Sequence, residues 1–227
     1  MRLAFTAVQH TSGCTKPERG AGSAFGAQRL KSADQIGTPS PPQWERGWFA
    51  GARHCASPNF SARPAGVVPD LALLHSISLP PGVYGGDGVE RLFTNTLDWE
   101  AHPYFQSIRG LQVSAHFFIR RDGALWQFVS CDDRAWHAGQ STFAGRDNCN
   151  DFSIGIELEG LEGQTFEPAQ YAQLLALLSA LVKNYPLGDI AGHSDVAPGR
   201  KIDPGSGFDW FRLTEWAGPM HINVPVR

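Results

Sequence analysis

One amphipathic helix flanked by strand patterns constrains the fold of this chain most. In "PAQYAQLLALLSALVKNYP", apolar residues from Tyr171 to Tyr185 recur at steps of three and four, which predicts a helix with one buried face. Pro168 suits the first turn of that helix, and Pro186 ends it. Such a helix must bury its apolar face against another element, and the strand patterns on either side of it indicate a sheet.

The strand patterns define what kind of sheet this is. "LALLHSI" (71–77) and "DIAGH" after the helix are short apolar runs that predict buried strands, and "FSIGIELEG" (152–160) alternates strictly. Two further runs, 113–121 and 124–129, are joined by Asp-Gly, which predicts a hairpin with a type I′ turn. We therefore expect an α/β (mixed α+β) fold with a central mixed β-sheet flanked by helices.

Composition narrows the class of protein. The chain has 227 residues, 42% of them hydrophobic and 18% charged, with a net charge of -3. These values predict a globular protein and give no support to nucleic-acid binding or to a membrane span. Residues 1–42 are rich in Gly, Ser, Pro and Gln and lack any helical or strand period, so we expect a disordered N-terminal tail. One domain is expected over 43–215, followed by a C-terminal tail over 216–227.

The N-terminus and the cysteines bear on the cellular compartment. The apolar stretch after Arg2 is short, is broken by polar residues and precedes no A-x-A site, so we expect no export signal. The four cysteines form no C-x-x-C pair and show no disulfide framework, so we expect reduced thiols.

Two of the eight histidines stand where sites usually form. His75 and His193 each end a predicted buried strand, and strand ends in open sheets are where sites gather. Asp203 follows His193 in the loop "GHSDVAPGRKIDPG", whose Gly and Pro residues allow it to fold back. Two His and one carboxylate, with a fourth position open for water, form the ligand set of a catalytic zinc. The motif HExxH is absent, so the signal rests on placement rather than on a fixed spacing.

Acidic and basic candidates accompany this ligand set. Glu157 lies inside the strand pattern 152–160, where a buried carboxylate needs a partner or a task. Glu159 shares its face, so periodicity does not separate the two, although its place nearer the strand end favours solvation. Lys201 is either a solvated loop lysine or part of the site. Neither G-x-S-x-G nor a G-x-G-x-x-G after a strand occurs, so serine-hydrolase and dinucleotide-binding readings are unsupported.

A set of ordered motifs then carries a family resemblance. The segments "LLHSISLPPGVYGG", "VSAHFFIRRDGALWQFV", "RAWHAG", "GRDNCNDFSIGIELEG" and "GHSDVAPGRKIDPG" together closely resemble the N-acetylmuramoyl-L-alanine amidases. The similarity is greatest to the cytoplasmic branch that cleaves 1,6-anhydro-muropeptides, and it covers about residues 47 to 213. The N-terminal tail has no counterpart in that family.

The resemblance implies a fold, a metal and a reaction. The fold would be that of the amidases and peptidoglycan-recognition proteins. One zinc ion per chain would be held by His75, His193 and Asp203, with Glu157 and Lys201 as the catalytic residues. The enzyme would hydrolyse the amide between 1,6-anhydro-N-acetylmuramic acid and L-alanine during peptidoglycan recycling.

The resemblance also implies where and on what the protein acts. Trp136 and Arg200 resemble residues of the substrate groove. The expected partner is an anhydro-muropeptide, with neither nucleic acid nor membrane, and the expected location is the cytoplasm. A monomer is the default expectation.

Some positions depart from the family pattern. Ser76 stands where many relatives have Asn, and Ile202 where many have Thr. Asn148 replaces an Arg that some relatives use for the stem-peptide carboxylate, and nearby Arg146 is the candidate substitute. These changes affect the expected preference for the peptide end and leave the expected metal site intact.

Two alternatives follow from the same resemblance. A binding module of the peptidoglycan-recognition type would share the fold, but such modules typically lack a zinc ligand. The second is a secreted or phage-type amidase acting on the intact wall, which the absence of an export signal and the similarity to the anhydro-muropeptide branch disfavour. A zinc peptidase of unrelated type is a more distant reading, because its HExxH motif is missing.

Overall fold

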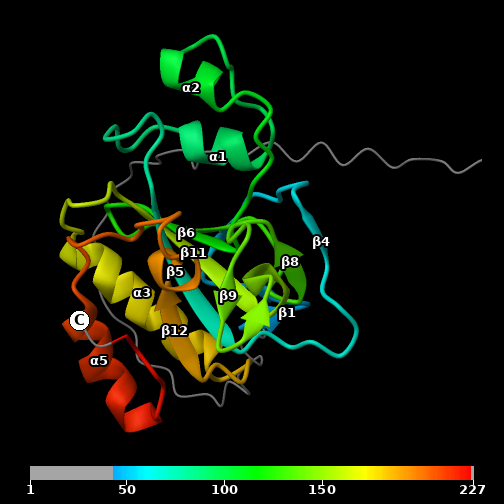
Figure 1. Ribbon diagram of the computed structural model, residues 1–227, viewed down its shortest axis with the longest axis vertical. Coiled ribbons are helices and arrows are strands. Elements are labelled where there is room, and N and C mark those ends of the chain that lie inside the picture. The colour runs from blue at the N-terminus through cyan, green and yellow to red at the C-terminus, as the bar shows by residue number, and fades with distance from the viewer. Residues whose placement is uncertain (1–42, 226–227) are drawn as a thin grey trace, which may run out of the picture.

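A six-stranded mixed sheet forms the centre of the molecule. The computed structural model describes residues 43–225. Figure 1 shows the sheet with α3 and α5 on one side and with α1 and α2 beyond one end. The strand order is β12–β5–β11–β6–β7–β3, which confirms the predicted mixed α+β fold. The strands in this order are Asp189–Gly192, Leu71–Ile77, Ser153–Glu159, Phe117–Ile119, Leu125–Gln127 and Arg53–His54.

Parallel pairing brings the carboxyl ends of four strands to one edge of the sheet. β12, β5, β11 and β6 run parallel, so their carboxyl ends share an edge of the sheet. The register places Glu157 of β11 opposite His75 of β5, and Gly192 of β12 opposite Leu74. His193 therefore begins beside His75 although the two are far apart in sequence.

Helix α3 (Pro168–Leu181) covers one face of the sheet. The inward side chains of β11, including Ile154 and Ile156, are fully buried in one cluster with Leu174 and Leu178 of α3. Burying a leucine stabilises a fold by about 1.5–3 kcal/mol, so this contact is a main contribution to the core. The helix is present where the sequence predicted it, but it is shorter. The prediction extended to Tyr185, whereas α3 ends at Leu181 and is followed by a turn. Asn184 closes that turn, because its side-chain amide donates to the carbonyl of Ala180.

The predicted hairpin is present, but its turn type differs. β6 and β7 pair antiparallel, and they are shorter than the sequence pattern suggested. Arg120 N donates to Ala124 O and Gly123 N donates to Arg120 O, which closes a three-residue loop. Among the loop residues only Gly123 has a positive φ, of 82°, so the type I′ prediction is wrong. A tight turn followed by a left-handed glycine is the usual three-residue alternative.

The opposite face of the sheet is covered by irregular chain rather than by a long helix. Leu71 and Leu73 of β5 pack there with Ala138, Cys149 and Val196. The covering elements are β8 (Asp133–Ala135), β9 (Thr142–Phe143), β10 (Arg146–Asp147), η1 (Cys149–Asp151) and α4 (His193–Val196). Short strands pair beside them: β4 (Phe60–Ala62) with β8, and β1 (Trp44–Glu45) with β2 (Trp48–Phe49). This face holds the candidate site.

Two further helical regions complete the described chain. α1 (Gly88–Phe93) and α2 (Pro103–Ser107) belong to a second apolar cluster at the end of the sheet. α5 (Trp210–Ala217) and η2 (Gly218–Met220) pack near α3, and Ile222 is buried in the same core. Asn223 N donates to Gly188 O, so ordered contacts continue past residue 215. The predicted tail over 1–42 lies outside the described residues.

The cysteines differ from expectation at one position. Cys131 and Cys149 are free and buried, as expected for reduced thiols. Cys55 is disulfide-bonded, so the expectation of reduced thiols is wrong there. Among the described residues, no helix has the length and apolar character needed to cross a membrane.

Candidate active site

Three side chains converge at the carboxyl edge of the sheet. His75 comes from β5, His193 begins α4 directly after β12, and Asp203 ends the loop that follows. The Nδ1 atoms of the two histidines are 3.0 Å apart, and each lies 3.1 Å from Oδ2 of Asp203. Ser194 N donates to Asp203 O at 3.0 Å, which closes the loop as its Gly and Pro content predicted.

The geometry of this group fits a small metal ion. All three residues are buried, and their ligand atoms lie within 4.8 Å of one another. Two imidazole nitrogens and one carboxylate oxygen are a ligand set of catalytic zinc, which binds them at about 2.0–2.2 Å in tetrahedral geometry. Ligand atoms around such an ion are about 3.3 Å apart, close to the separations found here. The residues present therefore fit a zinc ion with one position left for another ligand.

The pKa values of His75 and Asp203 favour the protonation states that bind a metal ion. Burial lowers the pKa of His75 to about 4, so its imidazole is neutral at physiological pH. Burial alone would raise the pKa of Asp203, but its polar contacts with His193 and His75 bring it below the usual value. A neutral imidazole and an ionised carboxylate are the forms that bind metals.

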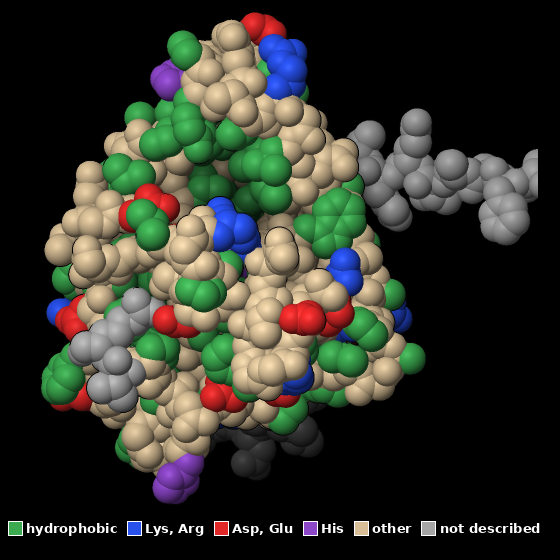
Figure 2. Space-filling view, viewed as in Figure 1, with side chains coloured by type: hydrophobic (Ala, Val, Ile, Leu, Met, Phe, Trp, Pro, Cys, Tyr) green, Lys and Arg blue, Asp and Glu red, His purple; other side chains and the backbone are tan. Residues whose placement is uncertain are grey.

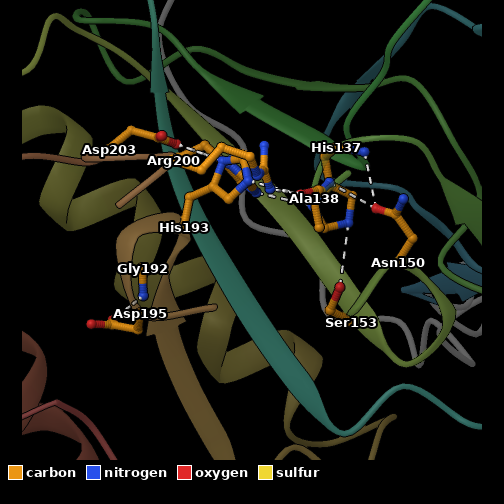
Figure 3. Close-up of polar contacts among 10 residues, drawn as sticks. His137, Ala138, Asn150, Ser153, Gly192, His193, Asp195, Arg200 and Asp203 are labelled. Carbon is orange, nitrogen blue, oxygen red and sulfur yellow. Dashed lines mark hydrogen bonds and ion pairs between the residues drawn. The ribbon is translucent and has the colours of Figure 1, made fainter. Parts of the chain in front are cut away.

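The outward nitrogens of both histidines are also engaged, as Figure 3 shows in part. His193 Nε2 lies 3.0 Å from the carbonyl oxygen of Ala138, and His75 Nε2 lies 2.9 Å from Nδ1 of His137. Burial and the neighbouring His75 lower the pKa of His137 well below its usual value. Sequence reasoning gave His137 no role, because it lies in irregular chain without a period. Its place in "RAWHAG" was the one available signal.

The structure separates the two acidic residues of β11. Glu159 is buried, with Oε1 accepting from Gly85 N at 2.6 Å and Oε2 from Arg121 N at 3.0 Å. The expectation that Glu159 is solvated is therefore wrong. Glu157 lines the cavity at the site, and its Oε2 is buried without a hydrogen-bond partner among the described residues. Burial, reinforced by the charge of Asp203, raises the pKa of Glu157 well above its usual value.

A cavity of about 260 Å³ opens onto the three ligands. Glu157 and the exposed Lys201 line its polar side, and the charge of Lys201 acts on the pKa of both Glu157 and His75. Figure 2 shows this hollow below the region of α1 and α2, with hydrophobic side chains along its wall and a basic side chain at its rim. The apolar side is lined by Leu79, Leu92, Phe93, Ile108, Leu111 and Val113. The cavity thus joins a polar, metal-binding side to an apolar one.

The residues expected in the substrate groove are held by contacts within the protein. Trp136 is half-buried, and its indole N–H donates to Ser61 Oγ at 3.3 Å. Arg200 Nη2 donates to the carbonyl oxygens of Ala138 and Gln140. The guanidinium of Arg200 therefore supports the same carbonyl that faces His193.

Arg146 is placed away from the three ligands. It forms a bidentate ion pair with Asp70, at 2.8 and 3.0 Å, and its guanidinium lies over the ring of Phe152. Asp70 precedes β5, so this pair lies at the amino end of the strand whose carboxyl end bears His75. The structure does not bring Arg146 to the cavity.

The three positions that depart from the family pattern lie in different surroundings. Ser76 lines the cavity, and its Oγ is buried without a hydrogen-bond partner among residues 43–225. Ile202 is 68% exposed beside Lys201. Asn148 adopts a left-handed conformation, with φ of 58°, before η1. Of the three, only Ser76 lines the cavity.

The chain matches known proteins over a region that includes all residues of this site. A sequence profile described as N-acetylmuramoyl-L-alanine amidase matches residues 69–206. The chain is 54% identical over 173 residues to the 1,6-anhydro-N-acetylmuramyl-L-alanine amidase AmpD of Escherichia coli strain K12. That match covers 74% of this chain and 93% of the relative.

Solved structures agree with the sequence matches. A crystal structure of a selenomethionine AmpD derivative has a TM-score of 0.74 at 50% identity, covering 76% of this chain and 97% of that one. The solution structure of Citrobacter freundii AmpD has a TM-score of 0.58 at 50% identity, covering 78% and 96%. Nearly the full length of each relative thus corresponds to this chain.

Proposed function

Because the chain belongs to the N-acetylmuramoyl-L-alanine amidase family, we propose that it hydrolyses the amide between N-acetylmuramic acid and L-alanine in muropeptides. One observation carries the proposal: two histidines and an aspartate converge beside an unpartnered buried glutamate in a single cavity. The 1,6-anhydro form of the sugar is the proposed substrate, because the relatives that match most of the chain are named for it.

Zinc is the proposed metal, with one ion per chain held by His75, His193 and Asp203. The donor set and the separations of 3.0–3.1 Å support this choice. When bound, such an ion supplies Lewis-acid chemistry, since it makes a water molecule acidic near neutral pH and polarises an amide carbonyl.

Glu157 is the proposed general base. Its carboxylate lines the cavity and has an oxygen that no described residue satisfies, so it is available to a water molecule. Burial raises its pKa well above the usual value, so this carboxylate binds a proton more readily than an exposed one and is suited to accept and return a proton. Glu157 would take a proton from the attacking water and then deliver one to the departing amine of L-alanine. Protonation of that nitrogen turns a poor leaving group into a neutral amine.

Lys201 is the proposed stabiliser of negative charge. As water adds to the amide carbonyl carbon, the carbonyl oxygen becomes an oxyanion. This oxyanion needs a cationic or hydrogen-bonding neighbour. Lys201 lines the cavity with Glu157 and the three metal-ligand candidates. Its ammonium group is exposed on a flexible stem, so it can follow the carbonyl oxygen of a bound substrate.

Trp136 remains the proposed contact for the sugar. It directly precedes His137, which lines the cavity; Trp136 itself does not line the cavity, and its indole N–H donates to Ser61 Oγ. Arg200 and Arg146 are engaged by protein groups, so a role for either in substrate binding would require those contacts to be shared or broken. A cytoplasmic monomer remains the expectation, which cell fractionation and sedimentation would test.

Mass spectrometry of purified 1,6-anhydro-N-acetylmuramoyl-tripeptide provides the direct test. Incubation with the protein should release free peptide, a chelator should stop the release, and zinc should restore it. The variant Glu157→Gln should bind zinc and release peptide at least 100-fold more slowly, as expected for loss of a general base. Zinc binding by the wild-type protein without any peptide release would overturn the proposed reaction and favour a binding module.

A further inference from the structure

The segment His137–Ala138 contacts both metal-binding histidines. Its first residue offers ring Nδ1 to His75 Nε2 at 2.9 Å, and its second offers a carbonyl oxygen to His193 Nε2 at 3.0 Å. Figure 3 shows His137 and Ala138 lying between His193 and Asn150. Two neighbouring residues thus hold the outer nitrogens of both imidazole ligands.

This segment is itself held from several sides. Asn150 Oδ1 accepts hydrogen bonds from His137 N at 3.1 Å and from Ala138 N at 2.8 Å (Figure 3). Arg200 Nη2 donates to Ala138 O at 2.7 Å. The ring of His137 lies so close to Gly155 that a Cβ added there would be 2.5 Å from the ring. The position of the segment is therefore strongly determined.

The hydrogen-bond pattern fixes where the protons lie. Nδ1 of His75 faces the ligand group and must keep its lone pair, so the proton is on Nε2 and is donated to Nδ1 of His137. His137 then carries its own proton on Nε2, which faces Ser153 Oγ at 3.4 Å. Ser153 Oγ donates onward to the carbonyl of Cys149 at 2.5 Å. The same reasoning gives His193 its proton on Nε2, where it is donated to Ala138 O.

We propose that His137–Ala138 is an orienting clamp that selects the tautomer and ring orientation of both metal-binding histidines, with His137 as a positioning residue for His75. This inference rests on the proposed zinc site. Imidazole ligands depend on such outer contacts, and losing one lowers metal affinity about 10–100-fold. His137 does not ligate the metal in this assignment, because its Nδ1 is occupied by His75.

Two substitutions of similar size separate orientation from packing. His137→Asn places Oδ1 where Nδ1 lies and keeps an acceptor for His75, whereas His137→Leu fills the space without one. Zinc affinity is measured by competition with a chromophoric chelator, and the visible spectrum of the cobalt-loaded protein reports ligand geometry. We expect zinc affinity to fall about 10–100-fold in His137→Leu and to stay within about threefold of wild type in His137→Asn.

The unfolding of the metal-free proteins is the folding control. If both variants lose stability and zinc affinity equally, His137 serves packing alone and the proposal is overturned. Wild-type zinc affinity and cobalt spectrum in His137→Leu would overturn it as well. If the wild-type protein binds no zinc, the zinc site itself fails. If the wild type binds zinc without releasing peptide, only the proposed reaction fails, because the affinity comparison does not depend on turnover.

Discussion

Glu157 and Glu159 lie on the same face of β11, and their surroundings give them opposite effects on stability. Glu159 accepts two backbone hydrogen bonds, so its charge is compensated. Glu157 is buried with an unpartnered oxygen, so its ionised form is disfavoured and its pKa is raised. A reactive carboxylate of this kind costs stability in the resting protein.

Glu157→Gln should stabilise the metal-free protein, increasingly so as the pH rises. In the unfolded chain Glu157 ionises near its ordinary pKa of about 4.3, while in the folded chain it holds its proton to higher pH. The unfolded state therefore binds fewer protons between these two values, and wild-type stability falls as the pH rises through that window. Urea unfolding of both proteins from pH 5 to pH 8 measures the difference. A constant difference across this range would contradict the assignment.

Glu159→Gln is the matched variant, and it should destabilise. Glutamine offers one oxygen where Gly85 N and Arg121 N each need an acceptor, and it turns an N–H₂ group toward the other amide. Leaving a buried donor unpaired costs about 1–3 kcal/mol, which urea unfolding at pH 7 would detect. Stability equal to that of wild type would show that water satisfies these amides.

Sequence reasoning reached the three proposed metal ligands because their positions follow from general rules. His75 and His193 end buried strands, and Asp203 lies in a loop rich in Gly and Pro, so topology alone brings them together. The choice between Glu157 and Glu159 could not be made, because alternation gives the face of a strand and not its hydrogen-bond partners. His137 was missed for a related reason, since its role depends on an irregular segment crossing β11.

At the scale of elements, β11 supports the site through its shape as well as its side chains. The strand is buried on both faces, and Gly155 leaves room for the ring of His137 between Ser153 and Glu157. Strand 71–77 was predictable from its short apolar run and strand 153–159 from the alternation of residues 152–160. The hairpin turn and the end of α3 were not, because local hydrogen bonds outside the periodic segments decide them.

Gly155→Ala should weaken zinc binding without altering a ligand. The added methyl group would lie 2.5 Å from the His137 ring, so the ring must move and its hydrogen bond to His75 must lengthen. We expect a loss of about 1–3 kcal/mol in stability from overpacking and about tenfold or more in zinc affinity. Gly188→Ala is the control, since no atom lies within 4 Å of the Cβ it would add. Equal zinc affinity in the two variants would count against the clamp.

For the whole molecule, the proposed metal site joins distant parts of the chain. Strand β5, the first residue of α4 and the loop after α4 would each contribute one ligand, and His137 comes from the segment that covers the sheet. The unfolded chain cannot hold these groups together, so an ion that binds the folded state adds its binding free energy to folding. Loss of the metal ion should therefore destabilise this edge of the sheet, and disruption of the edge should weaken metal binding.

Zinc removal should lower the thermal stability of the whole domain. At a free zinc concentration 100 times the dissociation constant, the linkage amounts to about 2.7 kcal/mol. For a chain of this size that corresponds to a melting temperature about 5–10 °C higher with zinc than with a chelator. In Asp203→Ala the ligand group loses its carboxylate, so calorimetric scans with zinc and with chelator should nearly coincide. If Asp203→Ala kept the full wild-type shift, zinc would be binding elsewhere on the protein, and the proposed ligand set would have to be abandoned.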